Sequence, residues 1–431
     1  MIDALDECDP QDVGVLTDVT NNLNESCPPW LSVLVTCRVD GKVAEQLTDV
    51  GKVELKRKDT DNMSDIKRYL KEPLGAFMDR ISLDGGLTTL TKKTQGSFTC
   101  AYVYKNRLSE KPADSKIAMR EVTTLFPDGL EQNLQEILKG YKERIPVERD
   151  LKNAYVTITS VIASAREPIS LDFIFDIVGA KYFELCKEAV KEGLGPLLNV
   201  DGEKIEFINH CIVEWLFDTK AGEYRLDREI GRQEFASLCT KWITGIIDGD
   251  LELDPSLKAY ALKHSMYHLT DYRGNTEPIG KMLCSLKYAR EKLCLPDIKL
   301  KHLLDDYEHQ HMQIASDKVI NVKDYMRKYP QIWEQIRLFE KFIYDKKDEI
   351  SECPKFVMHI AANYSKLERI QQNAKTELDS EPWLEDLQQC LKRIVSQRIL
   401  EVPSVLSIFL LMGKQWLLLL RMRITTSNSR F

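Results

Sequence analysis

The 431-residue sequence predicts a mainly α-helical protein that begins with a small parallel α/β piece. Three observations predict this class. Apolar residues recur at helical spacing through most of the chain. The continuous apolar run in "WLSVLVTCRVD" fits a strand that is buried on both faces, as in a parallel sheet covered by helices. The stretch "PLLNVDGEKIEFIN" has an Asp-Gly pair between two β-type runs, which indicates an antiparallel hairpin.

The first forty residues bring charged side chains to the ends of two predicted strands. Asp3, Asp6 and Glu7 follow Ile2, and Arg38 follows the second apolar run. In open α/β sheets the carboxyl ends of the strands are where ligands bind. One acidic and one basic strand end therefore suit a magnesium phosphate.

Residues from about 62 to 148 have helical spacing. We expect a helix in "MSDIKRYLKEPL", with Ser64 or Asp65 as its N-terminal cap. We expect "LTKKTQGSFTCAYVYKNRL" to be a single helix in which Gly96 permits a close approach rather than ending it. A further amphipathic stripe consists of Leu130, Leu134, Ile137, Leu138 and Tyr141.

Residues 151–227 combine three helical stretches with the predicted hairpin, which describes a winged helix. Many winged helices bind DNA, but this region has eight Lys and Arg against thirteen Asp and Glu, a balance of −5. Phosphate binding depends on clustered basic residues, so we expect protein contacts and no nucleic acid. From 228 to about 395 the pattern is almost entirely helical and predicts stacked helices, as in the stripe Ile332, Ile336, Phe339 and Ile343.

Composition and short motifs bear on thiol state, metal binding and cellular location. The eleven cysteines form no C-x-x-C pair, which gives little support to a zinc or redox site and favours reduced intracellular thiols. We take the spaced pair His264 and His268 as ordinary helix residues, because no third metal ligand lies nearby in the sequence. The N-terminus lacks the pattern of a secretory signal, and the Leu-rich run near the C-terminus is broken by Gly413, Lys414 and Gln415. We therefore expect a cytoplasmic protein with no membrane partner.

Several motifs, in this order, resemble the NACHT branch of the STAND signalling NTPases, which are P-loop NTPases. "IDALDEC" is similar to the family's Walker B motif, and "VLVTCR" is similar to its sensor 1 strand. "SDIKRYL", "GSFTCAYV", "FPDGLEQNLQEILKGY" and "FINHCIVEWLFD" resemble segments of its helical lid and winged helix. Beyond residue 320, a helical stretch resembles the segment that precedes the propeller in NACHT and WD-repeat proteins.

The resemblance implies a role for each candidate residue. Asp3 would belong to the magnesium shell, and Asp6 or Glu7 would polarise the hydrolytic water. Arg38 would read the terminal phosphate, and His210 would touch the phosphates in the closed state. The cofactors of the intact parent would be ATP or ADP with magnesium, and its partners would be proteins, with a possible homo-oligomer.

The resemblance also implies a domain order. We expect a remnant of the NTPase sheet in 1–60, a helical lid in 61–148, the winged helix in 149–227, a superhelical α-helical arm in 228–398, and a degenerate or misframed start of a WD repeat in 399–431.

The Walker A loop, G-x-x-x-x-G-K-[ST], does not occur in the sequence, and this loop provides most of the nucleotide affinity. We therefore interpret the chain as a fragment of a nucleotide-switched signalling scaffold that does not itself bind or hydrolyse nucleotide. The alternative is a stand-alone helical and winged-helix adaptor that binds proteins and has no nucleotide role. A nucleic-acid-binding winged helix ranks last because of the charge.

Overall fold

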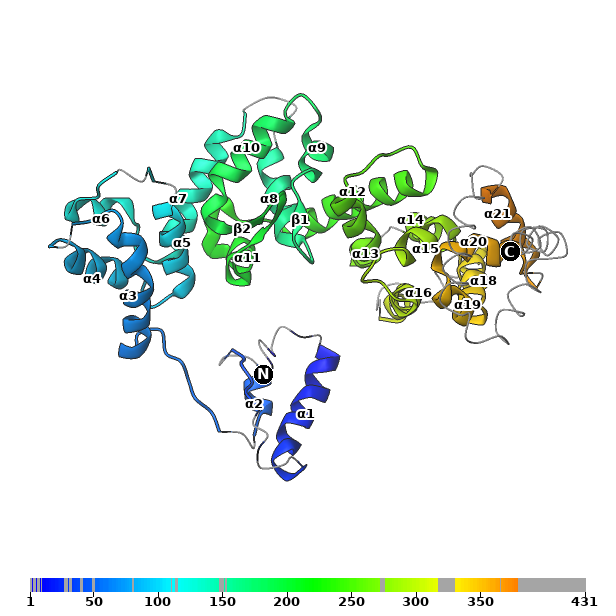
Figure 1. Cartoon of the computed structure of the whole chain (residues 1–431), viewed down its shortest axis with the longest axis horizontal. Helices are drawn as coiled ribbons and strands as arrows, with labels where there is room; N and C mark the ends of the chain where they lie inside the picture. The colour runs from blue at the N-terminus through cyan, green and yellow to red at the C-terminus, as the bar shows by residue number, and fades with distance from the viewer. Residues whose placement is uncertain are drawn as a thin grey trace, which may run out of the picture. The chain divides into compact units, whose positions relative to one another are not determined.

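The computed structural model describes residues 2, 5, 8, 10–26, 30, 33–38, 42–48, 51–79, 81–109, 111–112, 115–146, 151, 153–271, 276–316, 330–364 and 366–378. The described chain is mainly helical and contains a three-stranded antiparallel sheet (Figure 1). This confirms the mainly α class that the sequence predicts. The chain divides into two compact units, Met1–Asn133 and Leu134–Phe431.

The N-terminal unit is built from helices. They are α1 (Pro10–Ser26), α2 (Lys42–Gln46), α3 (Thr60–Gly75), α4 (Leu83–Lys93), α5 (Phe98–Ser109), α6 (Met119–Leu125) and α7 (Gly129–Arg144), and the boundary between the units falls inside α7.

The C-terminal unit contains the sheet and the remaining elements. They are α8 (Ala154–Ser164), β1 (Ile169–Ser170), α9 (Phe173–Val178), α10 (Phe183–Gly193), η3 (Gly195–Leu197), β2 (Leu198–Asp201), β3 (Lys204–Phe207), α11 (His210–Phe217), η4 (Thr219–Tyr224), α12 (Arg228–Asp248), α13 (Pro255–Asp271), α14 (Thr276–Leu283), α15 (Leu286–Leu293), α16 (Leu300–Ser316), α18 (Pro330–Asp345), α19 (Lys347–Glu352), η5 (Pro354–Phe356), α20 (Val357–Ala362) and α21 (Glu368–Leu378).

The first described residues form a parallel β-bridge between Ile2 and Val35. The Ile2 N–H donates to the Leu34 carbonyl at 2.8 Å, and the Thr36 N–H donates to the Ile2 carbonyl at 2.9 Å. Beside this bridge Leu5 is fully buried, in a small apolar cluster with Val43 and Leu47. The two segments thus meet at one bridge. The prediction of a strand buried on both faces is wrong, because Val33 and Leu34 are 40% and 61% exposed.

The apolar faces of α3, α4, α5 and α6 make one hydrophobic core. The helix predicted in "MSDIKRYLKEPL" is confirmed, and Ile66 and Leu70 are fully buried on its inner face. The predicted start of this helix is wrong, because α3 begins at Thr60, with Asp59 at the N-cap position. Ser64 and Asp65 lie inside the helix. The sequence pattern located the buried face but not the first turn, where few apolar residues mark the period.

The single helix predicted across "LTKKTQGSFTCAYVYKNRL" is also wrong, because the segment is two helices, α4 and α5. The chain turns between them at Gln95 and Gly96, which have φ values of 54° and 78°. The predicted close approach is correct. A Cβ atom on Gly96 would lie 1.8 Å from the Arg57 carbonyl oxygen. The Asn62 side-chain amide donates to that same oxygen at 2.6 Å and so holds the junction before α3 in place.

The sheet of the C-terminal unit has the order β1-β3-β2, with both pairs antiparallel. The predicted hairpin is confirmed, since Asp201 pairs with Lys204 at its tip. The turn residues are therefore Gly202 and Glu203 rather than Asp201 and Gly202. Only Gly202 has positive φ, at 61°, which is the pattern of a type II′ turn.

The longest helix of this unit, α12, packs against α8 and α13 along its length. Gly231 makes the contact with α8 close, because a Cβ at this position would lie 2.9 Å from the Ser164 hydroxyl. The predicted stripe on α18 is confirmed, since Ile336, Phe339 and Ile343 are buried.

A buried ion pair joins α15 to α16. The Lys292 ammonium lies 2.5 Å from an Asp306 carboxylate oxygen, and the two side chains are 2% and 9% exposed. The Tyr288 hydroxyl donates to the same carboxylate oxygen at 3.0 Å. The pair therefore has an additional hydrogen bond that helps to offset its loss of water.

In the part of the chain that the structure describes, every helix is too short or too polar to cross a bilayer. The Leu-rich run at 402–422 lies outside the described residues, as do the last part of the predicted 228–398 array and all of 399–431.

We predict opposite effects for alanine at two glycines of the N-terminal unit. Gly96→Ala should lower the free energy of unfolding by about 2 kcal/mol or more, because alanine is strained at positive φ and its Cβ meets a fixed backbone oxygen. Gly85→Ala, in the first turn of α4, should raise it by about 0.5 kcal/mol, since the new Cβ makes an ordinary contact with Met119. Urea unfolding followed by circular dichroism measures both. Equal effects would contradict the assigned conformation of Gly96.

Candidate functional site

The structure gives a position for two of the five residues that the sequence singles out. Asp3, Asp6 and Glu7 lie outside the described residues. Arg38 is exposed, three residues after the bridge at Val35. His210 belongs to the other compact unit, as the first residue of α11.

The surroundings of His210 are those of a helix start at the surface. Asn209 caps α11, since its side-chain oxygen accepts from the Cys211 N–H at 2.9 Å. The His210 side chain is 58% exposed, and its Nδ1 lies 3.6 Å from a carboxylate oxygen of Glu214. The imidazole is therefore accessible to a ligand or to another surface.

The residues of this chain do not fit a complete nucleotide site. A triphosphate needs the backbone amides and the Lys of a glycine-rich loop, and the sequence has no such loop. Within the described residues no group of three or more His, Cys, Asp or Glu side chains could hold a metal ion. The magnesium residue suggested by the resemblance, Asp3, lies outside them.

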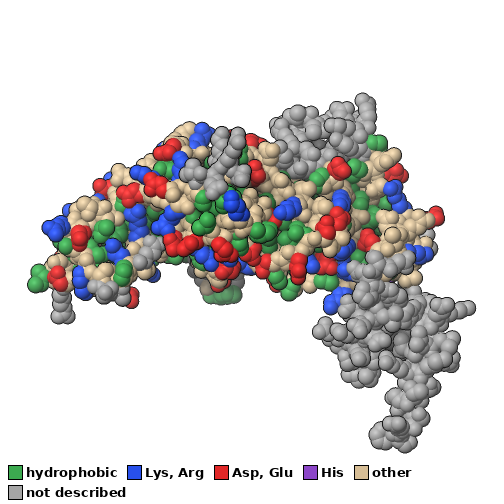
Figure 2. Space-filling view, turned by 90° about the horizontal axis from the view of Figure 1, so that it is seen from above, with side chains coloured by type: hydrophobic (Ala, Val, Ile, Leu, Met, Phe, Trp, Pro, Cys, Tyr) green, Lys and Arg blue, Asp and Glu red, His purple; other side chains and the backbone are tan. Residues whose placement is uncertain are grey.

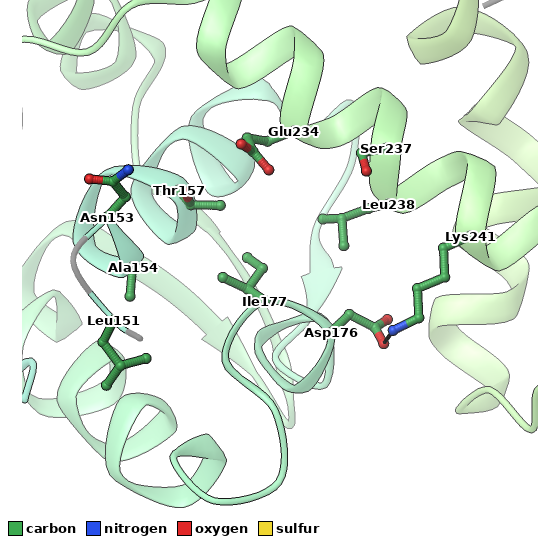
Figure 3. Close-up of a pocket in the computed structure, with 10 residues that line it drawn as sticks. All are labelled: Leu151, Asn153, Ala154, Thr157, Asp176, Ile177, Glu234, Ser237, Leu238 and Lys241. Carbon is green, nitrogen blue, oxygen red and sulfur yellow. Dashed lines mark hydrogen bonds and ion pairs between the residues drawn. The ribbon is translucent and has the colours of Figure 1, made fainter. Parts of the chain in front are cut away.

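A cavity of about 300 Å³ lies between α8, α9 and α12 (Figure 3). Its walls combine apolar side chains with hydroxyl, amide and charged groups. The lining residues are Leu151, Asn153, Ala154, Thr157, Asp176, Ile177, Glu234, Ser237, Leu238 and Lys241.

Asp176 is the most enclosed charged group of this cavity. Its side chain is 7% exposed, although α9 is otherwise an apolar segment. The Lys241 ammonium lies 2.5 Å from one carboxylate oxygen, and the indole N–H of the fully buried Trp242 donates to the other. Asp176 thus provides the hydrogen-bond acceptor for the buried Trp242 indole and links α9 to α12.

A second cavity, of about 720 Å³, borders the same helix and shares Ser237 and Lys241 with the first. It adds Gln233, Thr240, Thr244 and Asp250, so polar groups follow one side of α12 for several turns. Side chains of this kind can hydrogen-bond the backbone and side chains of a peptide segment.

The sequence pattern alone does not identify the residues that line these two cavities. The available signal was Asp176 itself, a lone acid inside the apolar run "FIFDIV", where a charge needs a partner.

The pair His264 and His268 takes part in core packing. His268 is 4% exposed and stacks on Phe235, with ring centroids 3.9 Å apart. The Tyr260 hydroxyl lies 2.9 Å from His268 Nε2 and accepts from the Arg166 N–H at 3.0 Å. Tyr260 therefore donates its own proton to a neutral His268. Burial, with smaller contributions from His264 and Arg166, lowers the pKa of His268 to about 3.

The exposed face of α10 is acidic. Glu184, Leu185 and Glu188 are exposed on it. Its two lysines are already paired, since Lys187 and Lys191 each lie 3.0 Å from a carboxylate oxygen of Glu203 on the hairpin. In Figure 2, acidic and basic side chains are interspersed over the coloured surface.

A scan against protein-family models, a search of curated proteins and a search of solved structures each returned no match for this chain.

We predict that Asp176 acts mainly as a hydrogen-bond acceptor. Asp176→Ala should lower the free energy of unfolding by about 1–3 kcal/mol, because the buried Trp242 indole loses its acceptor. Asp176→Asn keeps an acceptor oxygen and loses the ion pair with the half-exposed Lys241, so it should cost less than about 1 kcal/mol. Urea unfolding followed by tryptophan fluorescence compares the two variants. A larger loss for Asn than for Ala would show that the charge matters more.

We predict that the C-terminal unit loses stability as the pH falls below about 6.5. The pKa of His268 is lower in the folded state, so its contribution is fully present above 6.5 and is lost progressively toward pH 3. His268→Leu should reduce the slope of unfolding free energy between pH 6 and pH 4 by up to about 1.4 kcal/mol per pH unit. Part of the slope should remain, because burial also lowers the pKa of His264 despite the opposing charge of Glu167. An unchanged slope in His268→Leu would contradict this assignment.

Proposed function

We propose that the chain is the part of a nucleotide-switched signalling scaffold of the NACHT type that follows the phosphate-binding loop. In such a scaffold ATP or ADP with magnesium sets the conformation, and the output is assembly with protein partners, including further copies of itself. The chain as given is proposed to neither bind nor hydrolyse nucleotide.

The observation that carries this proposal is the parallel pairing of Ile2 with Val35. It supports a shared sheet for the Walker B-like and sensor 1-like segments. In a parallel sheet both segments end at the same edge, so Asp3 and Arg38 would border one cleft. A helix, α1, connects the two segments, as parallel pairing requires.

The C-terminal unit gives a second line of support. The order α8, β1, α9, α10 and the β2–β3 hairpin, with β3 between the other strands, supports a winged helix. The acidic face of α10 supports a protein-binding winged helix over a DNA-binding one. In the proposed parent, His210 would reach the phosphates from this domain, and Arg38 would reach them from the sheet.

A second candidate function is a stand-alone helical adaptor that binds proteins and has no nucleotide role. The polar cavities along α12 favour it, because they could hold a peptide segment without any help from the N-terminal residues. A chimera in which a Walker A strand, loop and helix are joined before Met1 distinguishes the two functions by its affinity for ATP.

The scaffold proposal expects this chimera to bind ATP. Its affinity should fall about tenfold or more in Arg38→Ala, because a charged hydrogen bond to phosphate is lost. Thr36→Ala, two residues earlier and exposed, serves as the control and should leave the affinity unchanged. A folded chimera that binds ATP equally well with and without the Arg38→Ala substitution would favour the adaptor.

For the unmodified chain we predict no heat of binding when magnesium ATP is titrated at micromolar to low millimolar concentrations. The reason is that the loop that supplies most of the phosphate contacts does not occur in the sequence. Isothermal titration calorimetry measures this directly. Micromolar binding would show that a different phosphate site exists and would overturn this part of the proposal.

A further inference from the structure

Residues 51–61 form a continuous exposed segment that leads into α3. The backbone from 51 to 59 is non-helical, and α3 begins at Thr60. Val53 and Leu55 are 87% and 91% exposed, so even the apolar side chains of this segment face solvent. The side chains of the segment are therefore accessible to an enzyme. To bind as an extended chain, the segment would first open the turn in which the Asp59 N–H donates to the Lys56 carbonyl at 3.2 Å.

The segment places basic residues at fixed distances before an exposed hydroxyl. Lys56, Arg57 and Lys58 stand four, three and two residues before Thr60. Protein kinases select substrates by such charge patterns, because acidic side chains in their peptide groove pair with basic residues of the substrate. A basic group three residues before the acceptor suits kinases that prefer basic substrates.

We propose that Thr60 is a phosphorylation site for a basophilic serine/threonine protein kinase. This inference is independent of the proposed nucleotide switch, since it uses only the exposed segment and the first turn of α3.

The reaction transfers one phosphoryl group from ATP. Thr60 Oγ1 attacks the γ-phosphorus, an O–P bond forms, and the bond from the γ-phosphorus to the bridging oxygen breaks. ADP leaves with that oxygen, and the hydroxyl proton passes to the catalytic carboxylate of the kinase. No other reactant is needed.

Arg stands three residues before a hydroxyl at four other positions, Thr123, Thr276, Ser396 and Thr426. Of these, Thr123 lies in a clearly different backbone setting. Thr123 has Arg120 three residues before it, but both lie in α6. There the Thr123 hydroxyl donates to the Arg120 carbonyl at 2.6 Å. A kinase would have to unfold this helix to bind the arginine. At Thr60 it would have to open the first turn of α3 and the turn at Lys56–Asp59, and to release the Arg57 carbonyl from Asn62. Thr123 is therefore a built-in control.

Phosphorylation would reverse the charge of the segment. Residues 51–61 contain four Lys and Arg and three Asp and Glu, a balance of +1. A phosphate adds about two negative charges, which gives about −1. The phosphate would lie at the N-terminus of a 16-residue helix, where the helix dipole favours negative charge. The modified chain would keep α3 and lose the basic character of the segment.

The test incubates the full chain with the catalytic subunit of cAMP-dependent protein kinase and magnesium ATP. Arg also stands three residues before Thr276, Ser396 and Thr426, so peptide mapping is needed to assign each phosphate. The mapping should show a phosphate on Thr60. Thr60→Ala should abolish its incorporation, and Thr60→Ser should retain it. Arg57→Gln should slow the reaction about tenfold or more, because a charged hydrogen bond to the kinase is lost. Thr123→Ala should leave the rate unchanged.

Several outcomes would overturn the proposal. They are the absence of phosphate after complete reaction of a control peptide, a phosphate on Thr123 or Ser64 in place of Thr60, and an unchanged rate for Arg57→Gln. Because Thr60 is exposed, neither substitution at this position should prevent folding, and circular dichroism of each variant checks this.

Discussion

The close contact of α12 with α8 is the constraint on which most of the C-terminal unit depends. Gly231 allows the helices to approach so closely that a methyl group in its place would meet the Ser164 hydroxyl. Once α12 is held there, its other side chains reach two further helices. Trp242 meets Asp176 on α9, and Phe235 stacks on His268 of α13. The cavity that Asp176 lines, between α8, α9 and α12, is the space that remains between these contacts.

Helical periodicity predicted the buried faces well, because burial of an apolar stripe is the main reason that these helices form. The stripe ending at Tyr141 and the one on α18 are buried as expected, except that their first residues, Leu130 and Ile332, are half-buried. Periodicity did not locate the ends of α3 or the break at Gly96. The break depends on a carbonyl oxygen of Arg57, about forty residues away in sequence, and no local pattern contains that information.

The same limit applies to the candidate site, of which the sequence predicted one part and not the other. The sequence predicted strands before Asp3 and before Arg38, and the backbones of Ile2 and Val35 pair in parallel. It offered no means of finding the cavity at Asp176, because that cavity depends on how three separate helices meet. A polar residue in an apolar run signals that a partner exists, but only the fold identifies Trp242 and Lys241 as the partners.

The buried pair of Lys292 and Asp306 has an evolutionary consequence. Replacing either residue alone leaves an uncompensated charge in the interior between α15 and α16. Replacing both by apolar residues of similar volume would cost little, but an intermediate with one substitution must come first. Among descendants of this chain, the two positions should therefore either both be substituted or both be kept.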